Sequence, residues 1–326
     1  MELRKDPITR SWVVVGHPER GGNRQDPCAL CPEHRIEPRS LLEMPGNGPW
    51  QIRVIPHFRP LYHIEGEPGR CAEGIYDCMS AIGAHEIIVE ARDHLRTFSQ
   101  LSDDEITRVL EVYAMRIVDL KRDARFKYVS IFKNQGPAAA EDWAHAHSQV
   151  MATTFVPRRM SYELRAAREW YRDRERCVFC DILRQEIRQK KRLVECVGDY
   201  YAICPYASRV PYETWILPRT HNHQFEAPHR GEHRRHLATL LGRTLRRLNQ
   251  VTNSYHMVLH TAPSTLQTKG ELSNYWRTIE SDYHWHFEIL PILSTTSKSY
   301  GLKEVYFNGI LPEEAAERLR QLDPEK

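Results

Sequence analysis

Four short apolar runs along the chain predict β-strands. Each contains β-branched or aromatic residues, which fit the pleated and partly buried surface of a sheet. The runs are EIIVEA (86–91), YVSIF (128–132), ETWIL (213–217) and HFEIL (286–290). Between them the pattern changes to a helical one, so sheet and helix alternate along the chain.

Helical periodicity is clearest after residue 102. Ser102 and Glu105 fit a capping box, in which each residue bonds a free backbone N–H of the other. Apolar side chains then recur every three or four positions, at Ile106, Leu110, Tyr113, Ile117 and Leu120. A matching helix is predicted near 232–251, and a basic helix at about 160–190 that is interrupted near Cys177.

The predicted elements occur twice in the same order. Three features of the first half of the chain return in the second, with spacings that differ only as loops of different length would produce. These are C-x-x-C at 28–31 and 177–180, HEIIVEARDH (85–94) and YETWILPRTH (212–221), and HAH (145–147) and HWH (284–286). We therefore predict an α+β protein of two similar halves, residues 1–157 and 158–326, each an antiparallel sheet with flanking helices.

Composition and charge exclude several classes of protein. Of 326 residues, 41% are hydrophobic and 27% are charged, which is typical of a globular chain. The net charge of only +3 argues against a nucleic-acid-binding protein, although the segment RQEIRQKKR (184–192) is basic. No apolar run is long enough to span a membrane, and the first ten residues lack the apolar core of a signal peptide. We expect a soluble cytoplasmic protein.

The cysteines predict metal sites. Four of the eight form the two C-x-x-C pairs, and in a cytosolic chain such pairs combined with distant histidines favour zinc over a disulfide. The repeat supplies two histidines to each pair, which gives two sets of four ligands. The predicted sets are Cys28, Cys31, His94 and His145, and Cys177, Cys180, His221 and His284.

Each chain would thus bind up to two Zn²⁺ ions, in closed structural sites that have no open position for water. His34 and His223 are nearby substitutes that would change the ligand sets. The remaining cysteines, among them Cys71 and Cys78, are expected to be ordinary buried thiols.

The stretch HAHSQ (145–149) predicts the reactive site. On a strand, His145, His147 and Gln149 would point to the same side. If His145 binds zinc, His147 remains free to attack phosphorus as a neutral imidazole, and the amide of Gln149 can donate to a phosphoryl oxygen. The alternative for His147 is a buried histidine whose hydrogen bonds are satisfied within the fold.

Most of the chain resembles the galactose-1-phosphate uridylyltransferases and their relatives that phosphorolyse ADP-glucose, which belong to the histidine-triad superfamily. The resemblance rests on several segments along the chain. They are LRKDPITRSWVVVGHPER (3–20), GAHEIIVEARDH (83–94), FKNQG (132–136), HAHSQ (145–149), YHWHFEILP (283–291) and PEEAAERLR (312–320).

The resemblance implies histidine-triad-like halves, a catalytic motif in the first half and a degenerate one in the second, where Glu288 replaces the glutamine. It also implies a ping-pong reaction. His147 would attack the α-phosphorus of a nucleotide-sugar, sugar 1-phosphate would leave, and a second sugar 1-phosphate or inorganic phosphate would take the nucleotide from the histidine. Gln149 matches the phosphate-binding glutamine, Asn134 the active-site asparagine and Arg20 a phosphate-contacting arginine, and a homodimer is implied.

The chain departs from the resemblance at positions close to the substrate. Ala140 and Asp142 stand where the family has glycine and serine against the phosphates, and a carboxylate there would repel a diphosphate. His57 stands where the family often has an asparagine against the ribose, and the glycine-rich tail segment is replaced by SKSYGLKEVYFNG (297–309). Trp143 could close the pocket or belong to the core.

Three functions remain open from the sequence. The first is a UDP-glucose:hexose-1-phosphate uridylyltransferase. The second is an ADP-sugar phosphorylase or adenylyltransferase, and the third is a catalytically degenerate, zinc-stabilised nucleotide-binding protein, for which Asp142 speaks. The retained pair His147 and Gln149 argues against binding alone, because a scaffold needs neither residue.

Overall fold

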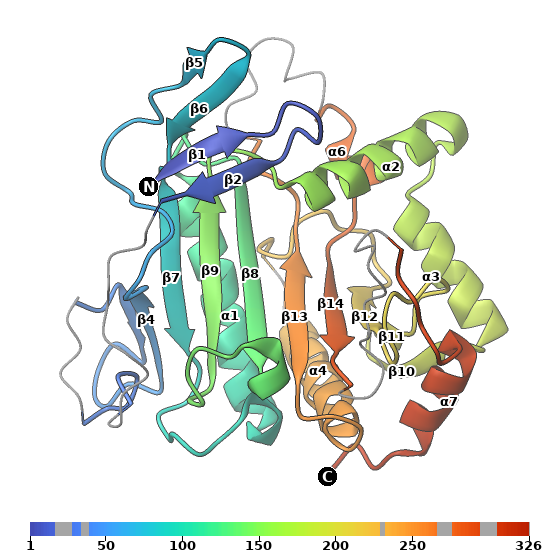
Figure 1. The fold of residues 1–326 in the computed structure, drawn as a ribbon. Helices are drawn as coiled ribbons and strands as arrows, with labels where there is room; N and C mark the ends of the chain where they lie inside the picture. The colour runs from blue at the N-terminus through green and yellow to red at the C-terminus, as the bar shows by residue number, and fades with distance from the viewer. Residues whose placement is uncertain (17–27, 34–38, 229–231, 266–275, 294–304, 326) are drawn as a thin grey trace.

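The computed structural model describes residues 1–16, 28–33, 39–228, 232–265, 276–293 and 305–325 (Figure 1). Its main feature is a ten-stranded sheet in which every strand runs antiparallel to its neighbours. In spatial order the strands are β10 (Leu193–Val197), β11 (Tyr200–Ile203), β12 (Thr214–Pro218), β14 (His286–Pro291), β13 (Tyr255–His260), β8 (Tyr128–Gln135), β9 (His147–Thr153), β7 (Gly83–Val89), β4 (Ile52–Pro56) and β3 (Leu42–Met44).

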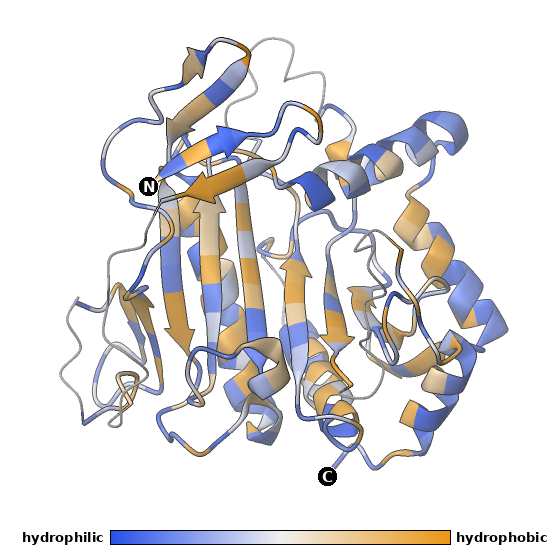
Figure 2. Ribbon diagram, viewed as in Figure 1, coloured by the Kyte–Doolittle hydropathy of each residue, from blue (hydrophilic) through white to orange (hydrophobic). Residues whose placement is uncertain are grey.

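The sheet continues without a break from the strands of the first half of the chain to those of the second. Strands from residues 42–153 make up one side of it and strands from residues 193–291 the other, and they meet where β8 pairs with β13. Hydrophobic and hydrophilic residues alternate along the strands (Figure 2), as expected of strands whose two faces have different surroundings.

Two long helices cover one face of the sheet. α1 (Asp103–Lys121) and α4 (His233–Asn249) lie behind the strands in Figure 1 and pack against each other. The predicted capping box at Ser102 and Glu105 is present at the start of α1. Where the helices touch, a Cβ on Gly242 would lie 2.9 Å from Cδ1 of Ile106, so only glycine fits the contact without a shift. The largest hydrophobic core lies between these helices and the sheet.

In the described part of the chain, helices cover the opposite face on the side formed by strands of residues 193–291. α2 (Arg158–Arg174) and α3 (Val178–Gln189) pack there over a second core. The break between the two helices agrees with the predicted interruption near Cys177. The other helices among the described residues are α6 (Ile279–Asp282), α7 (Pro312–Gln321) and the 3₁₀ turns η1 (Phe98–Gln100) and η2 (Pro137–Ala139). Over β7 and β9, none of the described helices lies on this face (Figure 1).

A small second sheet has the strand order β2-β1-β6-β5. Its strands are β1 (Glu2–Lys5), β2 (Trp12–Val15), β5 (Cys71–Glu73) and β6 (Tyr76–Ser80). A disulfide joins Cys71 to Cys78 across β5 and β6, and Cys71 is exposed. The expectation of buried thiols was wrong for this pair, because a two-residue turn at 74–75 places the two residues opposite each other in the ladder. It was also wrong for Cys196, a free thiol that is exposed, whereas Cys204 is buried as expected.

The predicted strands and helices are present, with one shift at the reactive motif. β9 begins at His147 rather than at His145, so His145 belongs to the segment that leads into the strand. His145, His147 and Gln149 are nevertheless all buried. None of the helices in the described part of the chain is both long and apolar enough to cross a bilayer.

Candidate active site and metal-ligand groups

The first predicted set of metal ligands is brought together. Cys28 and Cys31 lie in a tight turn, His94 follows β7, and His145 precedes β9. Their ligand atoms all lie within 4.8 Å of one another. Sγ of Cys31 is 3.4 Å from Nδ1 of His94 and 3.6 Å from Nδ1 of His145. Bonds of about 2.3 Å to sulfur and 2.0 Å to nitrogen on a tetrahedron place S and N about 3.5 Å apart, so this geometry suits zinc.

A hydrogen bond from the outer side of His145 prepares it for this role. Its Nε2 donates to the carbonyl oxygen of Ala91 at 2.7 Å, so Nδ1 keeps its lone pair toward the two sulfurs. Burial, followed by the charge of Cys28, raises the pKa of Cys31 to about 11. Two thiolates so close together therefore need a cation between them.

The second predicted set repeats this arrangement. Cys177 caps the N-terminus of α3 and Cys180 lies in its first turn. Sγ of Cys180 is 3.4 Å from Nδ1 of His221 and 3.5 Å from Nδ1 of His284, and Nε2 of His284 donates to the carbonyl oxygen of Pro218 at 2.9 Å. The alternative ligand His223 is not part of this group, and His34 lies outside the described residues.

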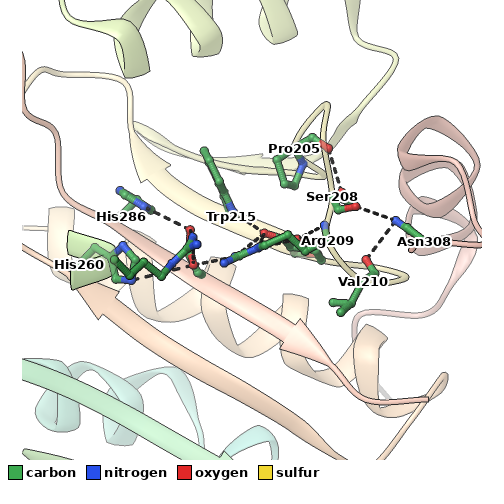
Figure 3. A network of polar contacts seen from close by, with 12 residues as sticks. Pro205, Ser208, Arg209, Val210, Trp215, His260, His286 and Asn308 are labelled. Carbon is green, nitrogen blue, oxygen red and sulfur yellow. Dashed lines mark hydrogen bonds and ion pairs between the residues drawn. The ribbon is translucent and has the colours of Figure 1, made fainter. Parts of the chain in front are cut away.

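A third group of possible metal ligands lies beside the second. It consists of Glu163 on α2, His260 at the end of β13, and His286 and Glu288 on β14 (Figure 3). The sequence reasoning missed Glu163 and His260. The repeat could have indicated His260. It stands in the second half at the position equivalent to Lys133 in the first, 127 residues earlier, and it pairs with His286 on the neighbouring strand.

The third group lies at the wall of a cavity, which Glu163 and Glu288 help to line. Nε2 of His286 is buried without a hydrogen-bond partner, and the rings of Phe179 and Trp215 lie against the imidazole. Arg159 and Arg209 both donate to the carboxylate of Glu288. A cavity of about 580 Å³ between α2, α3 and β12 lies next to this group.

Opposite charges face each other within the third group. Burial acts to raise the pKa of Glu163, but His260 and His286 hold it well below its usual value. His260, which lies 3.0 Å from this carboxylate, has a raised pKa although burial opposes the shift. These opposite shifts are those of an ion pair, and the same four residues offer the oxygen and nitrogen ligands of a metal site.

His147 lies on the open face of the sheet in a state suited to nucleophilic attack. Its Nδ1 donates to the carbonyl oxygen of His145 at 2.8 Å, which leaves the lone pair on Nε2. Burial, and after it the charge of Lys133, lowers the pKa of His147 to about 4. The imidazole is therefore neutral and nucleophilic at pH 7.

A buried ionic network supports the strand beneath His147. The ammonium of Lys133 donates to the carbonyl oxygen of His147 and to Glu90, each at 2.7 Å. Tyr113 of α1 donates to the same carboxylate at 2.9 Å, and Ser148 also donates to it. The side chains of Lys133 and Glu90 are fully buried. The sequence reasoning missed this network, because a lysine and a glutamate at these places also fit an ordinary alternating strand.

Gln149 and Asp142 meet beside His147. Nε2 of Gln149 donates to Oδ2 of Asp142 at 2.8 Å, and Oε1 of Gln149 lies 2.9 Å from Nε2 of His85. The ring of Trp143 lies edge-on to the rings of His147 and His57, with centroids 5.4 and 5.7 Å away. Trp143 therefore covers the site rather than the core behind the sheet.

The other predicted substrate residues are placed as follows. His57 belongs to the site, and its Nε2 is buried without a hydrogen-bond partner. Asn134 lies on β8, where its Oδ1 is 2.9 Å from Nδ1 of His256 on the neighbouring strand. Arg20 lies outside the described residues.

Comparison with known proteins gives one family. The family described as "Galactose-1-phosphate uridyl transferase" matches with its N-terminal domain at residues 65–157 and with its C-terminal domain at residues 163–326. The chain is 26% identical to an ADP-glucose phosphorylase of Arabidopsis thaliana, over 98% of this chain and 93% of the relative. It is 25% identical to a galactose-1-phosphate uridylyltransferase of Thermotoga maritima, over 100% and 99%. A solved structure described as a uridylyltransferase mutant superposes with a TM-score of 0.81 at 28% identity, over 98% and 97% of the two chains.

Proposed function

Because this chain belongs to the galactose-1-phosphate uridylyltransferase family of nucleotidyltransferases, we propose that it transfers a uridylyl group from UDP-glucose to a hexose 1-phosphate through His147. The observation that carries the proposal is the state of His147: a neutral imidazole, fixed through Nδ1, with the lone pair of Nε2 directed away from its own backbone. A histidine in this state is ready to attack phosphorus and needs no base.

The transfer would take two steps of the same kind. Nε2 of His147 attacks the α-phosphorus, the bond from that phosphorus to the bridging oxygen breaks, and sugar 1-phosphate leaves with the bonding electrons. A phosphate oxygen of the acceptor then attacks the same phosphorus, and the bond to Nε2 breaks. Gln149 donates to the phosphoryl oxygens as charge shifts onto them in each step. His57, Asn134, Asp142 and Arg20 would contact the substrate.

Two zinc ions per chain would hold the framework of the site. The S–N distances in both Cys–His groups suit tetrahedral zinc, and each group uses all four of its ligands. In the first group His145 is a ligand two residues before His147. Zinc there would fix the start of β9, and the chemistry itself would be left to the side chains of the strand.

A second candidate is an ADP-sugar phosphorylase, in which inorganic phosphate is the acceptor. The similarity to the Arabidopsis ADP-glucose phosphorylase along almost the whole chain favours it.

We further propose a cytoplasmic homodimer with halves at residues 1–157 and 158–326. Sedimentation velocity would test the dimer.

Isotope exchange tests the covalent route. Labelled glucose 1-phosphate should enter UDP-glucose or ADP-glucose when enzyme and donor are the only other components, since a nucleotidyl-histidine lets the leaving group return. The donor that takes up the label identifies the nucleotide. Comparing turnover with hexose 1-phosphate and with inorganic phosphate then shows which of the two is the acceptor. Binding of either donor without any exchange would contradict the proposal and favour a nucleotide-binding protein.

A further inference from the structure

The side-chain amide of Gln149 is held at both ends. Oε1 faces Nε2 of His85, and Nε2 donates to Asp142. Rotation by 180° about the Cγ–Cδ bond would exchange the amide oxygen and nitrogen with almost no change of shape. Only the hydrogen-bond partners therefore decide where the N–H groups point. The direction of Gln149 therefore depends on Asp142 at one end and, at the other, on which nitrogen of His85 carries the proton.

The surroundings of His85 allow one proton position. The backbone N–H of Leu61 donates to Nδ1 at 3.2 Å, so Nδ1 has no proton. Burial lowers the pKa of His85 to about 4, which keeps the ring neutral at pH 7 and places its single proton on Nε2. A donor at Nε2 requires the oxygen of Gln149 in front of it. The carboxylate of Asp142 independently requires the nitrogen at the other end.

The His85 ring is held rigidly in this place. It is 94% buried and stacks on His57, with ring centroids 3.9 Å apart and planes 8° from parallel. His57 is fixed in the same way, since the backbone N–H of Arg59 donates to its Nδ1 at 3.0 Å. The two rings form a platform without net charge on β7 and the end of β4, next to the strand that carries Gln149.

We propose that His85 is a positioning residue that acts through Gln149, by directing both amide N–H groups toward the phosphoryl group that His147 attacks. The inference rests on the proposed function, in which Gln149 faces that group. Oδ2 of Asp142, an anionic oxygen 2.8 Å from the amide nitrogen, marks the place of a phosphoryl oxygen. A hydrogen bond into the amide oxygen also polarises the N–H groups, which makes them better donors.

Two variants of nearly equal shape separate this role from a structural one. His85→Gln can still donate toward Oε1 of Gln149, whereas His85→Glu offers a carboxylate that only accepts and so competes with Asp142 for the amide nitrogen. We expect the rate of nucleotidyl-His147 formation in a single turnover to fall by about 10²–10³-fold in His85→Glu, as for the loss of a donor to a developing oxyanion. His85→Gln should stay within about tenfold of the unmodified chain. Thermal unfolding of both variants controls for a loss of packing.

Equal rates in the two variants would overturn the role of His85, as would an unchanged rate in His85→Glu. Failure of the proposed function is a separate outcome, in which the unmodified chain forms no adduct with any nucleotide-sugar. The proton position is then decided by the ring ¹⁵N shifts of His85 in the free protein, assigned by their loss in His85→Gln. A protonated Nε2 supports the inference, and a protonated Nδ1 contradicts it.

Discussion

At the scale of single residues, charged groups are arranged differently on the two faces of the sheet near His147. Behind the sheet, a fully buried ammonium and carboxylate neutralise each other under the backbone of His147. On the open face, the groups around His147 are neutral imidazoles and an amide, together with the exposed carboxylate of Asp142. The nucleophile therefore stays uncharged, and Asp142 is the residue that opposes a phosphate.

Asp142 is predicted to limit the use of UDP-glucose. It occupies an N–H of Gln149 and adds a negative charge where the substrate brings more. Asp142→Ser should raise kcat/KM for UDP-glucose by about tenfold, or roughly 1.4 kcal/mol. Asp142→Asn removes only the charge and keeps an oxygen for Gln149, so it separates the two effects. A kcat/KM at or below that of the unmodified chain in both variants would show that Asp142 does not limit the reaction.

Lys133 is predicted to be essential for stability. Lys133→Met leaves the carboxylate of Glu90 buried without its cation, which should lower the free energy of unfolding by about 3–5 kcal/mol in urea titrations. Adding Glu90→Gln should restore part of the loss, because an amide costs less to bury than an unpaired carboxylate. As a control, Arg172→Met removes one partner of the exposed pair with Asp173 and should leave stability unchanged. Equal effects of Lys133→Met and the control would contradict the account.

At the scale of elements, the two Cys–His groups connect loops and helix ends to the sheet. Each group takes both cysteines from one segment, one histidine from the segment after a strand and one from the segment before another, so three distant pieces of chain meet. In the second group, the cysteines at the start of α3 attach that helix to β12 and β14.

Removing either cysteine pair should remove one zinc ion per chain. The double variants Cys28→Ser with Cys31→Ser, and Cys177→Ser with Cys180→Ser, should each contain one equivalent less than the unmodified chain by mass spectrometry of the metal. Each should also unfold at a lower temperature, since metal binding contributes to folding. Cys196→Ser is the matched control, because Cys196 is an exposed free thiol outside both groups. Unchanged zinc in a double variant would contradict that ligand set.

At the scale of the whole molecule, the sequence predicted what depends on local pattern or on the repeat. The capping box at Ser102, the break before α3 and both Cys–His groups are examples. It did not predict what depends on how distant elements cross. Glu163 reaches His260 only because α2 lies over β13, and Gly242 meets Ile106 only because α4 crosses α1.

The roles of His85 and Lys133 were hidden for a related reason. Each fits an ordinary strand pattern, and its role becomes clear only once the register with the neighbouring strand is known. Ile87 pairs with Gln149, for example, and this register places His85 beside the amide. Which side chains lie next to each other on a sheet depends on the register of the paired strands, and this register cannot be read from a single sequence.

The mass of the intact protein after mixing with a nucleotide-sugar tests the central claim most directly. UDP-glucose and ADP-glucose should be tried first and quenched without acid, because the bond from phosphorus to imidazole nitrogen is acid-labile. The account predicts an adduct of one nucleotidyl group per chain that is absent in His147→Ala, and the mass of the adduct identifies the nucleotide. An adduct that persists in His147→Ala, or a zinc-loaded chain that binds these donors and forms none, would contradict it.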